Sequence, residues 1–132
     1  MSDHIHEKLS RGQWVAVYPY GYSLKIKNRI HTVEVDAQKK RVVQELYRLY
    51  ITENYSLSML AHYIQETYSL PLYKARVENI LKNKFYHGIM VVRGKEYPHD
   101  YEKMITKEEY DIVQDIMKQR GRGGKWKPKT KN

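Results

Sequence analysis

The sequence predicts an α+β fold, namely a mainly helical domain with a small β-sheet or hairpin, a helix-turn-helix-like pair and a flexible basic C-terminal tail. Apolar residues recur at helical spacing in four segments, and they alternate with polar residues at period two in a fifth. The last fifteen residues contain seven basic residues and no acidic one, so this segment buries too little apolar surface to fold alone. We therefore expect one domain at residues 1–120 and a tail or linker at residues 121–132.

Three helices are predicted in the centre of the chain. Asp36 is a suitable N-cap for a helix over residues 37–51, and Ser56 caps the next one, which Pro71 limits. A third helix is expected over residues 73–83. Their apolar faces contain, in turn, Val42, Val43, Leu46, Leu49 and Tyr50; Leu57, Leu60, Ala61 and Ile64; and Val77, Ile80 and Leu81.

The strands are predicted from period-two patterns. In residues 23–35, Leu24 and Ile26 alternate with Lys25 and Lys27, which indicates one or two half-buried strands. A further strand over residues 89–92 precedes a turn at residues 94–95, so that residues 96–97 can pair back as a hairpin.

The last helix has the clearest start signal. Thr106 and Glu109 form a capping box, and Ile105 and Tyr110 occupy the positions of a hydrophobic staple. At the other end of the chain, residues 3–10 are compatible with a short helix, whereas Pro19 argues against a regular helix over residues 14–22.

Composition restricts the classes of partner and chemistry. The 132-residue chain has a net charge of +9 and a pI near 9.6, which favours a polyanionic partner, most commonly nucleic acid. The absence of cysteine excludes disulfides, cysteine-ligated zinc and thiol nucleophiles. No apolar run of eighteen residues and no signal-peptide pattern is present, so we expect no membrane span and a cytoplasmic location.

The sequence shows no catalytic constellation. His4 and His6 are better explained as a surface pair than as metal ligands, because no HExxH motif or histidine cluster accompanies them. No serine lies in a nucleophile elbow, and no histidine is followed by arginine three residues later, as a tyrosine recombinase would require. We expect a non-enzymatic chain without cofactor or metal.

A binding surface is the stronger hypothesis. Residues 56–83 are typical of two helices joined by a short turn, in which the small residue Ala61 allows close crossing. The polar face of the second helix can contact base edges through Arg76 and Asn79 and phosphates through its lysines. An ordinary solvated helix face remains an alternative, as does binding through the strand bearing Lys25, Lys27 and Arg29. The candidate DNA-binding residues are Tyr73, Lys74, Arg76, Asn79, Lys82, Asn83, Lys84, Lys125 and Lys127.

Five motifs in order resemble the recombinase domain of the large serine site-specific recombinases, the family of phage integrases and long transposon resolvases. They cover about residues 11–120 and comprise Gly12-Gln-Trp-Val with Pro19-Tyr-Gly-Tyr22; Val43-Gln-Glu-Leu-Tyr-Arg-Leu-Tyr50; Ser56, Leu60, Ala61 and Ile64; Val77, Ile80, Leu81, Asn83, Tyr86 and Gly88; and Ile105-Thr-Lys-Glu-Glu-Tyr110. The stretch at residues 68–72 is shorter than is usual in the family.

The resemblance implies a DNA-binding domain that follows a serine catalytic domain and precedes a zinc-ribbon or coiled-coil region. The catalytic domain and the zinc-ribbon cysteines are missing from this sequence. We therefore expect binding to double-stranded DNA that positions the recombinase on its attachment site, with the catalytic domain of the same recombinase as a partner if the natural chain is longer. A basic RNA-binding module and a protein-interaction domain remain the alternatives.

Overall fold

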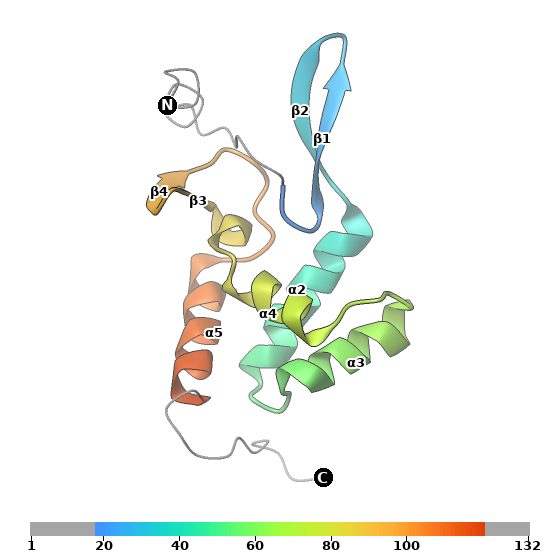
Figure 1. Ribbon diagram of the computed structural model, residues 1–132, viewed down its shortest axis with the longest axis vertical. Coiled ribbons are helices and arrows are strands. Elements are labelled where there is room, and N and C mark those ends of the chain that lie inside the picture. Colours follow the sequence, from blue (N-terminus) through green and yellow to red (C-terminus); the bar gives the residue numbers. More distant parts are fainter. Residues whose placement is uncertain (1–17, 121–132) are drawn as a thin grey trace.

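The computed structural model describes residues 18–120, except for the side chains of Lys27 and His31. The predicted helix at residues 3–10, the start of the 14–22 segment and the predicted tail lie outside these described residues. Within them, helix α2 (Ala37–Ile51) contacts helices α3 (Leu57–Tyr68), α4 (Lys74–Lys82) and α5 (Lys107–Arg120), while two small antiparallel hairpins lie outside the helical body (Figure 1). The predicted α+β class with a helix-turn-helix-like pair is confirmed.

Helix α2 supplies much of the core. The Asp36 side chain accepts a hydrogen bond from the Lys39 backbone N–H at 2.9 Å, which satisfies a donor that the first turn of a helix leaves unpaired. The helix begins and ends at the predicted residues. Its buried side chains are Val42, Val43, Leu46, Tyr47 and Tyr50.

Helices α3 and α4 form the predicted pair. The Ser56 side chain caps α3, and its buried stripe consists of Leu60, Ala61 and Ile64. Helix α4 is one residue shorter at each end than predicted, because Tyr73 and Asn83 have extended backbones and flank the helix. The Tyr47 hydroxyl lies 2.8 Å from the Ile80 carbonyl oxygen and 3.0 Å from that of Leu81, so α2 contacts carbonyls in the last turn of α4.

Helix α5 begins with the predicted capping box. The Thr106 N–H donates to the Glu109 carboxylate at 2.9 Å, and the Glu109 N–H donates to the Thr106 hydroxyl at 3.0 Å. The staple residues Ile105 and Tyr110 are both buried. The Tyr110 hydroxyl also donates to the Lys82 carbonyl at 2.9 Å, which fixes α5 against the end of α4.

The first hairpin departs from the sequence prediction. The predicted strand segment forms two strands, β1 (Tyr22–Lys27) and β2 (Ile30–Val35), which pair antiparallel through a turn whose residues Asn28 and Arg29 have φ of 51° and 66°. They are not half-buried along their length, however, because Leu24 and Ile26 are 46% and 60% exposed. The hairpin projects from the body, and only its base reaches the core (Figure 1).

The second hairpin consists of β3 (Ile89–Val92) and β4 (Lys95–Pro98), and it follows the short 3₁₀ helix η1 (Lys84–His87). Its turn is at Arg93 and Gly94, one residue earlier than predicted, because both have positive φ while Lys95 already belongs to β4.

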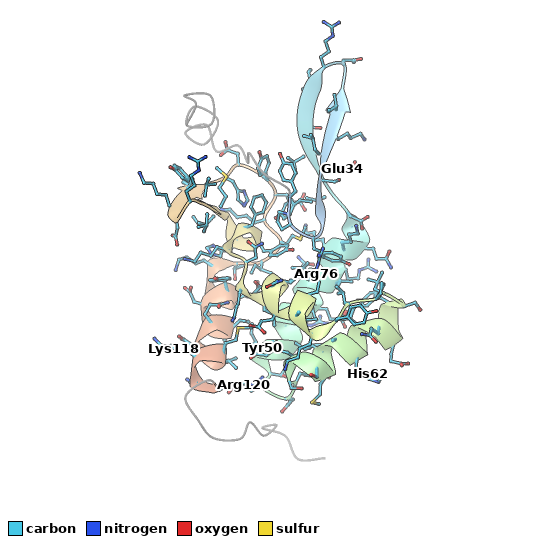
Figure 2. All side chains as sticks on the ribbon, viewed as in Figure 1. Glu34, Tyr50, His62, Arg76, Lys118 and Arg120 are labelled. Carbon is cyan, nitrogen blue, oxygen red and sulfur yellow. The ribbon has the colours of Figure 1, made fainter. Side chains whose placement is uncertain are left out.

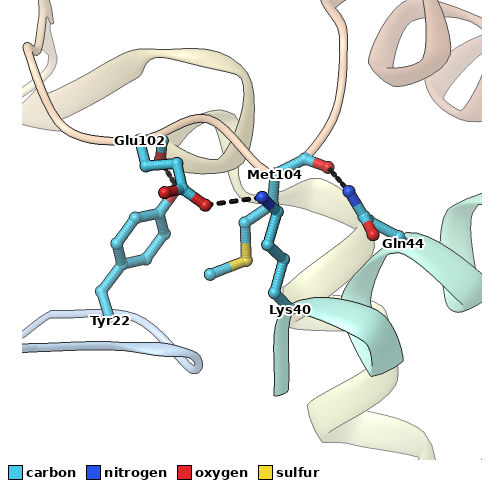
Figure 3. Close-up of polar contacts among 5 residues, drawn as sticks. All are labelled: Tyr22, Lys40, Gln44, Glu102 and Met104. Carbon is cyan, nitrogen blue, oxygen red and sulfur yellow. Dashed lines mark hydrogen bonds and ion pairs between the residues drawn. The ribbon is translucent and has the colours of Figure 1, made fainter. Parts of the chain in front are cut away.

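The segment before α5 is attached to α2 and to the base of the first hairpin (Figure 3). The Tyr22 hydroxyl donates to the Glu102 carbonyl, Lys40 pairs with the Glu102 carboxylate at 2.6 Å, and the Gln44 amide donates to the Met104 carbonyl at 2.9 Å. These contacts fix the base of the hairpin relative to the helices.

Candidate nucleic-acid interface

Helix α4 has one buried and one exposed face, as its sequence predicts. Val77, Ile80 and Leu81 are buried against the other helices. The exposed candidate residues are Tyr73, Lys74, Arg76, Asn79 and Lys82, whereas Asn83 and Lys84 are partly buried. The first five of the predicted contact residues are therefore all accessible to solvent.

Arg76 is supported by an aromatic ring from a distant part of the chain. Its guanidinium carbon lies 5.5 Å from the centroid of the Tyr20 ring, and the Lys39 ammonium lies 5.4 Å from the same centroid. A cation within about 6 Å of an aromatic face is attracted by the ring quadrupole. Tyr20 thus holds two cations beside the exposed face of α4.

The Tyr20 hydroxyl is buried and has no hydrogen-bond partner among residues 18–120. Burial is the main reason that its pKa lies above the usual tyrosine value; the nearby Asp36 carboxylate acts in the same direction, and Arg76 opposes both. The ring therefore stays neutral at physiological pH and acts as an aromatic surface for the two cations.

Two hollows adjoin the Tyr20–Arg76 contact. One has a volume of about 340 Å³ and lies against the segment between α3 and α4, and the other, of about 250 Å³, lies between α4 and the segment that precedes β1. Both Tyr20 and Arg76 line each hollow, and Asn79 lines the second. Arg76 and Asn79 thus border a hollow at the edge of the exposed face of α4.

The sequence interpretation did not assign Tyr20 or Lys39 to this surface. Tyr20 belongs to the recognised Pro19-Tyr-Gly-Tyr22 motif, but no local periodicity connects that motif to a helix so far along the chain. The chain turns directly after Tyr20, at Gly21, whose φ of 98° is a conformation that residues with a side chain rarely adopt.

The lysines at the end of α4 are already paired with carboxylates. Lys82 lies 2.7 Å from Glu78, whose pKa this hydrogen bond lowers, and Lys84 pairs with Glu96, which raises the lysine pKa. Exposed ion pairs of this kind stabilise a fold only slightly. Both lysines remain chemically suited to bind phosphate, but a phosphate has to displace the carboxylate or share the lysine with it.

Asn83 has a structural role that the sequence interpretation did not include. Its side-chain oxygen accepts a hydrogen bond from the Phe85 N–H at 2.9 Å and caps helix η1. Bidentate recognition of adenine uses both the oxygen and the nitrogen of an asparagine amide. Asn79 is therefore the better candidate for base contact.

The end of the described chain is fixed against the helical body. Arg120 lies 4.6 Å from the centroid of the Tyr50 ring, and its guanidinium donates to the Tyr55 carbonyl at 2.8 Å (Figure 2). The predicted contact residues Lys125 and Lys127 lie beyond it, outside the described residues.

Residues 18–120 contain no group of three or more histidine, cysteine, aspartate or glutamate side chains arranged to hold a metal ion. In the same part of the chain, none of the helices combines the length and the apolar character that crossing a bilayer needs. The buried His99 is engaged structurally: it stacks on Phe85 with ring centroids 4.2 Å apart, and its Nε2 lies 2.6 Å from the Phe85 carbonyl oxygen.

Residues 37–120 match the family described as Recombinase. The chain belongs to the Recombinase family. The resemblance indicated by the five sequence motifs is therefore confirmed, and the matched residues of this recombinase domain extend from α2 to the end of α5. No curated protein matches the domain in sequence.

Two solved structures share the fold of the recombinase domain. One concerns the sequence requirements of the Listeria innocua prophage attP site; it has a TM-score of 0.75 and 17% identity, over 91% of this chain and 52% of that chain. The other is the crystal structure of an LSR–DNA complex, with a TM-score of 0.74 and 16% identity, over 93% of this chain and 40% of that chain. The chain therefore spans about half or less of the length of these two proteins.

Proposed function

We propose that this recombinase domain binds double-stranded DNA and positions a serine site-specific recombinase on its attachment site. The observation on which this rests is the exposed face of α4, where Arg76 is held against Tyr20 and borders a concave surface together with Asn79. Family membership supports the proposal. So does the description of one structural neighbour as a complex with DNA and of the other by a prophage attP site.

In this proposal each group on the surface has a defined task. Arg76 donates two hydrogen bonds to a guanine edge, and Asn79 pairs with an adenine edge, because these are the side chains that fit those bases in the major groove. Lys74, Lys82, Lys84 and the tail residues Lys125 and Lys127 neutralise phosphates, which fixes the register without reading sequence. Strand cleavage and rejoining belong to a separate serine catalytic domain.

The test begins by selecting preferred duplexes from a random library with the full chain and measuring affinity by fluorescence anisotropy. Arg76→Ala and Asn79→Ala should each reduce the preference for the selected duplex over a random one, by about 1–3 kcal/mol for a bidentate contact. Arg48→Ala serves as the matched control, since Arg48 is an exposed arginine on α2 that pairs with Glu45.

Duplex RNA of the same sequence serves as competitor. If RNA displaces the selected DNA at equal concentration, double-stranded DNA is the wrong ligand. If Arg76→Ala and Asn79→Ala keep the full preference while Arg48→Ala loses it, the proposed surface is wrong. A chain that nicks supercoiled plasmid by itself would contradict the separate catalytic domain.

A further inference from the structure

The outer part of the β1–β2 hairpin exposes apolar side chains to solvent. Three of the seven large hydrophobic residues that the described chain exposes lie there: Leu24 at 46%, Ile26 at 60% and Ile30 at 63%. A two-stranded hairpin is marginally stable in water by itself, and concentrated exposed apolar groups usually mark a contact surface. The outer hairpin therefore needs a binding partner to explain its composition.

The register separates the two faces of this ribbon. Tyr22 pairs with Val35 and Leu24 with Val33, so one face leads from the buried core outward to Leu24 and Ile26. Lys25 pairs with Thr32 on the other face, where Lys25 also lies 3.6 Å from Glu34; Ile30, which pairs with Lys27, belongs to this second face. The tip is formed by Asn28 and the exposed Arg29.

Charge selects the class of partner. Residues 23–34 contain three cations (Lys25, Lys27 and Arg29) and one acid (Glu34), a net charge of +2. A DNA groove offers phosphates along its walls and sugars and thymine methyl groups within, so it accommodates cations and aliphatic side chains on one element. The major groove, about 12 Å wide, admits a two-stranded β-ribbon.

The hairpin is continuous with the α4 surface. Tyr20, which contacts Arg76, is followed directly by Gly21 and β1. Two backbone hydrogen bonds, each 3.0 Å long, close the base of the hairpin: the Tyr22 N–H donates to the Pro19 carbonyl, and the Asp36 N–H donates to the Gly21 carbonyl. In the view of Figure 2 the hairpin, on which Glu34 is labelled, rises above Arg76. A six-residue strand spans about 20 Å, or roughly six base-pair steps along a duplex strand.

We infer that the β1–β2 hairpin is a second DNA-contacting element, a basic and aliphatic ribbon that lies in a groove of the same duplex beyond the bases contacted by α4. This inference rests on the proposed function and extends the DNA-contacting surface from α4 to the hairpin. Lys25 and Arg29 contact phosphates, while Leu24, Ile26 and Ile30 contact sugars and base edges.

Two double variants of the full chain test the two kinds of contact. The double variant Lys25→Gln with Arg29→Gly removes two cations. It also leaves the sequence Asn-Gly at the turn, and because this dipeptide is well suited to two positive φ values, the hairpin should be retained. We expect the slope of log affinity against log salt to flatten by about 1.8, or 0.9 for each phosphate. Ile26→Ser with Ile30→Ser should weaken binding by about tenfold without changing that slope.

The control is Val91→Ser, which removes an exposed aliphatic residue from the other hairpin and should leave affinity unchanged. Hydroxyl-radical footprints of the hairpin variants should lose about six base pairs on one side while the region protected by α4 remains.

The outcomes separate this inference from the proposed function. If the wild-type chain binds duplex but the hairpin variants keep its affinity, salt slope and footprint, the hairpin inference is wrong and the α4 surface stands. If those variants instead abolish a self-association seen in sedimentation, the hairpin is a protein interface. If the wild-type chain does not bind duplex, both are wrong.

Discussion

Arg76 on α4 lies over the ring of Tyr20, with 5.5 Å between the guanidinium carbon and the ring centroid. This contact joins the segment before the first hairpin to the exposed face of the helix-turn-helix-like pair. It restricts the arginine side chain before any ligand arrives, which reduces the entropy that binding has to remove.

Replacement of Tyr20 should separate the role of its ring from that of its hydroxyl. Tyr20→Phe keeps the ring over which Arg76 lies and removes a buried oxygen without a partner among the described residues, so DNA affinity should be unchanged and the free energy of unfolding should rise by about 1 kcal/mol. Tyr20→Leu should weaken binding to the selected duplex by several-fold, because Arg76 loses its support. Anisotropy and urea denaturation measure the two effects; equal affinities for the Phe and Leu variants would show that the ring does not position Arg76.

Lys82 should act on phosphate and not on sequence. Lys82→Ala should weaken selected and random duplexes alike and flatten the salt slope by about 0.9. Lys107→Ala is the matched control, because Lys107 pairs with Asp111 four residues later at 2.8 Å, as Lys82 pairs with Glu78 four residues earlier at 2.7 Å. An equal slope change in both variants would indicate a general charge effect and exclude a specific contact.

Removal of residues 121–132 should flatten the salt slope and preserve the sequence preference. The deleted segment contains five basic residues and no acidic one, so the slope can fall by up to about 4.5 if each contacts a phosphate. Circular dichroism of the shortened chain checks that α5 is retained. A new preferred sequence after truncation would mean that the tail reads bases, for instance in a minor groove.

Acidification should destabilise the domain through His99. Burial lowers the pKa of His99, and Lys103 adds to this effect, although the hydrogen bond with the Phe85 carbonyl opposes it. The ring is held neutral, since Nε2–H donates to that carbonyl and Nδ1 accepts from the Tyr101 N–H at 3.2 Å. Because the folded pKa lies below the unfolded value near 6.5, stability is complete above about pH 6.5 and falls as the pH drops toward the folded pKa.

Denaturant unfolding at pH 7.5 and 5.5 measures this dependence on pH. His99→Gln should flatten it, leaving a contribution of the same sign from His87, whose pKa burial also lowers. His62→Gln is the control, because His62 is exposed on α3 and its side chain is 74% accessible. A dependence on pH that persists fully in His99→Gln would assign the effect to another group.

The sequence was sufficient wherever the cause of structure is local. Asp36 and the helical recurrence of apolar residues determine both ends of α2, and the reciprocal Thr106–Glu109 hydrogen bonds determine the start of α5. The same periodicity separates the buried residues of α4 from its exposed Arg76 and Asn79. Caps and amphipathic faces depend on residues within a few positions of one another, so they can be read from the chain alone.

The tertiary structure decided what depends on residues far apart. Alternation predicts that Leu24 and Ile26 share a strand face, but only the packing shows that both side chains remain exposed. The composition of α4 does not reveal that Asn83 caps η1 or that Tyr20 lies beneath Arg76. Periodicity predicts which side of a helix or strand is apolar. Which residues pack against that side depends on the burial of apolar surface over the whole fold. The surface around Arg76 was therefore determined by the folded chain and not by its local pattern.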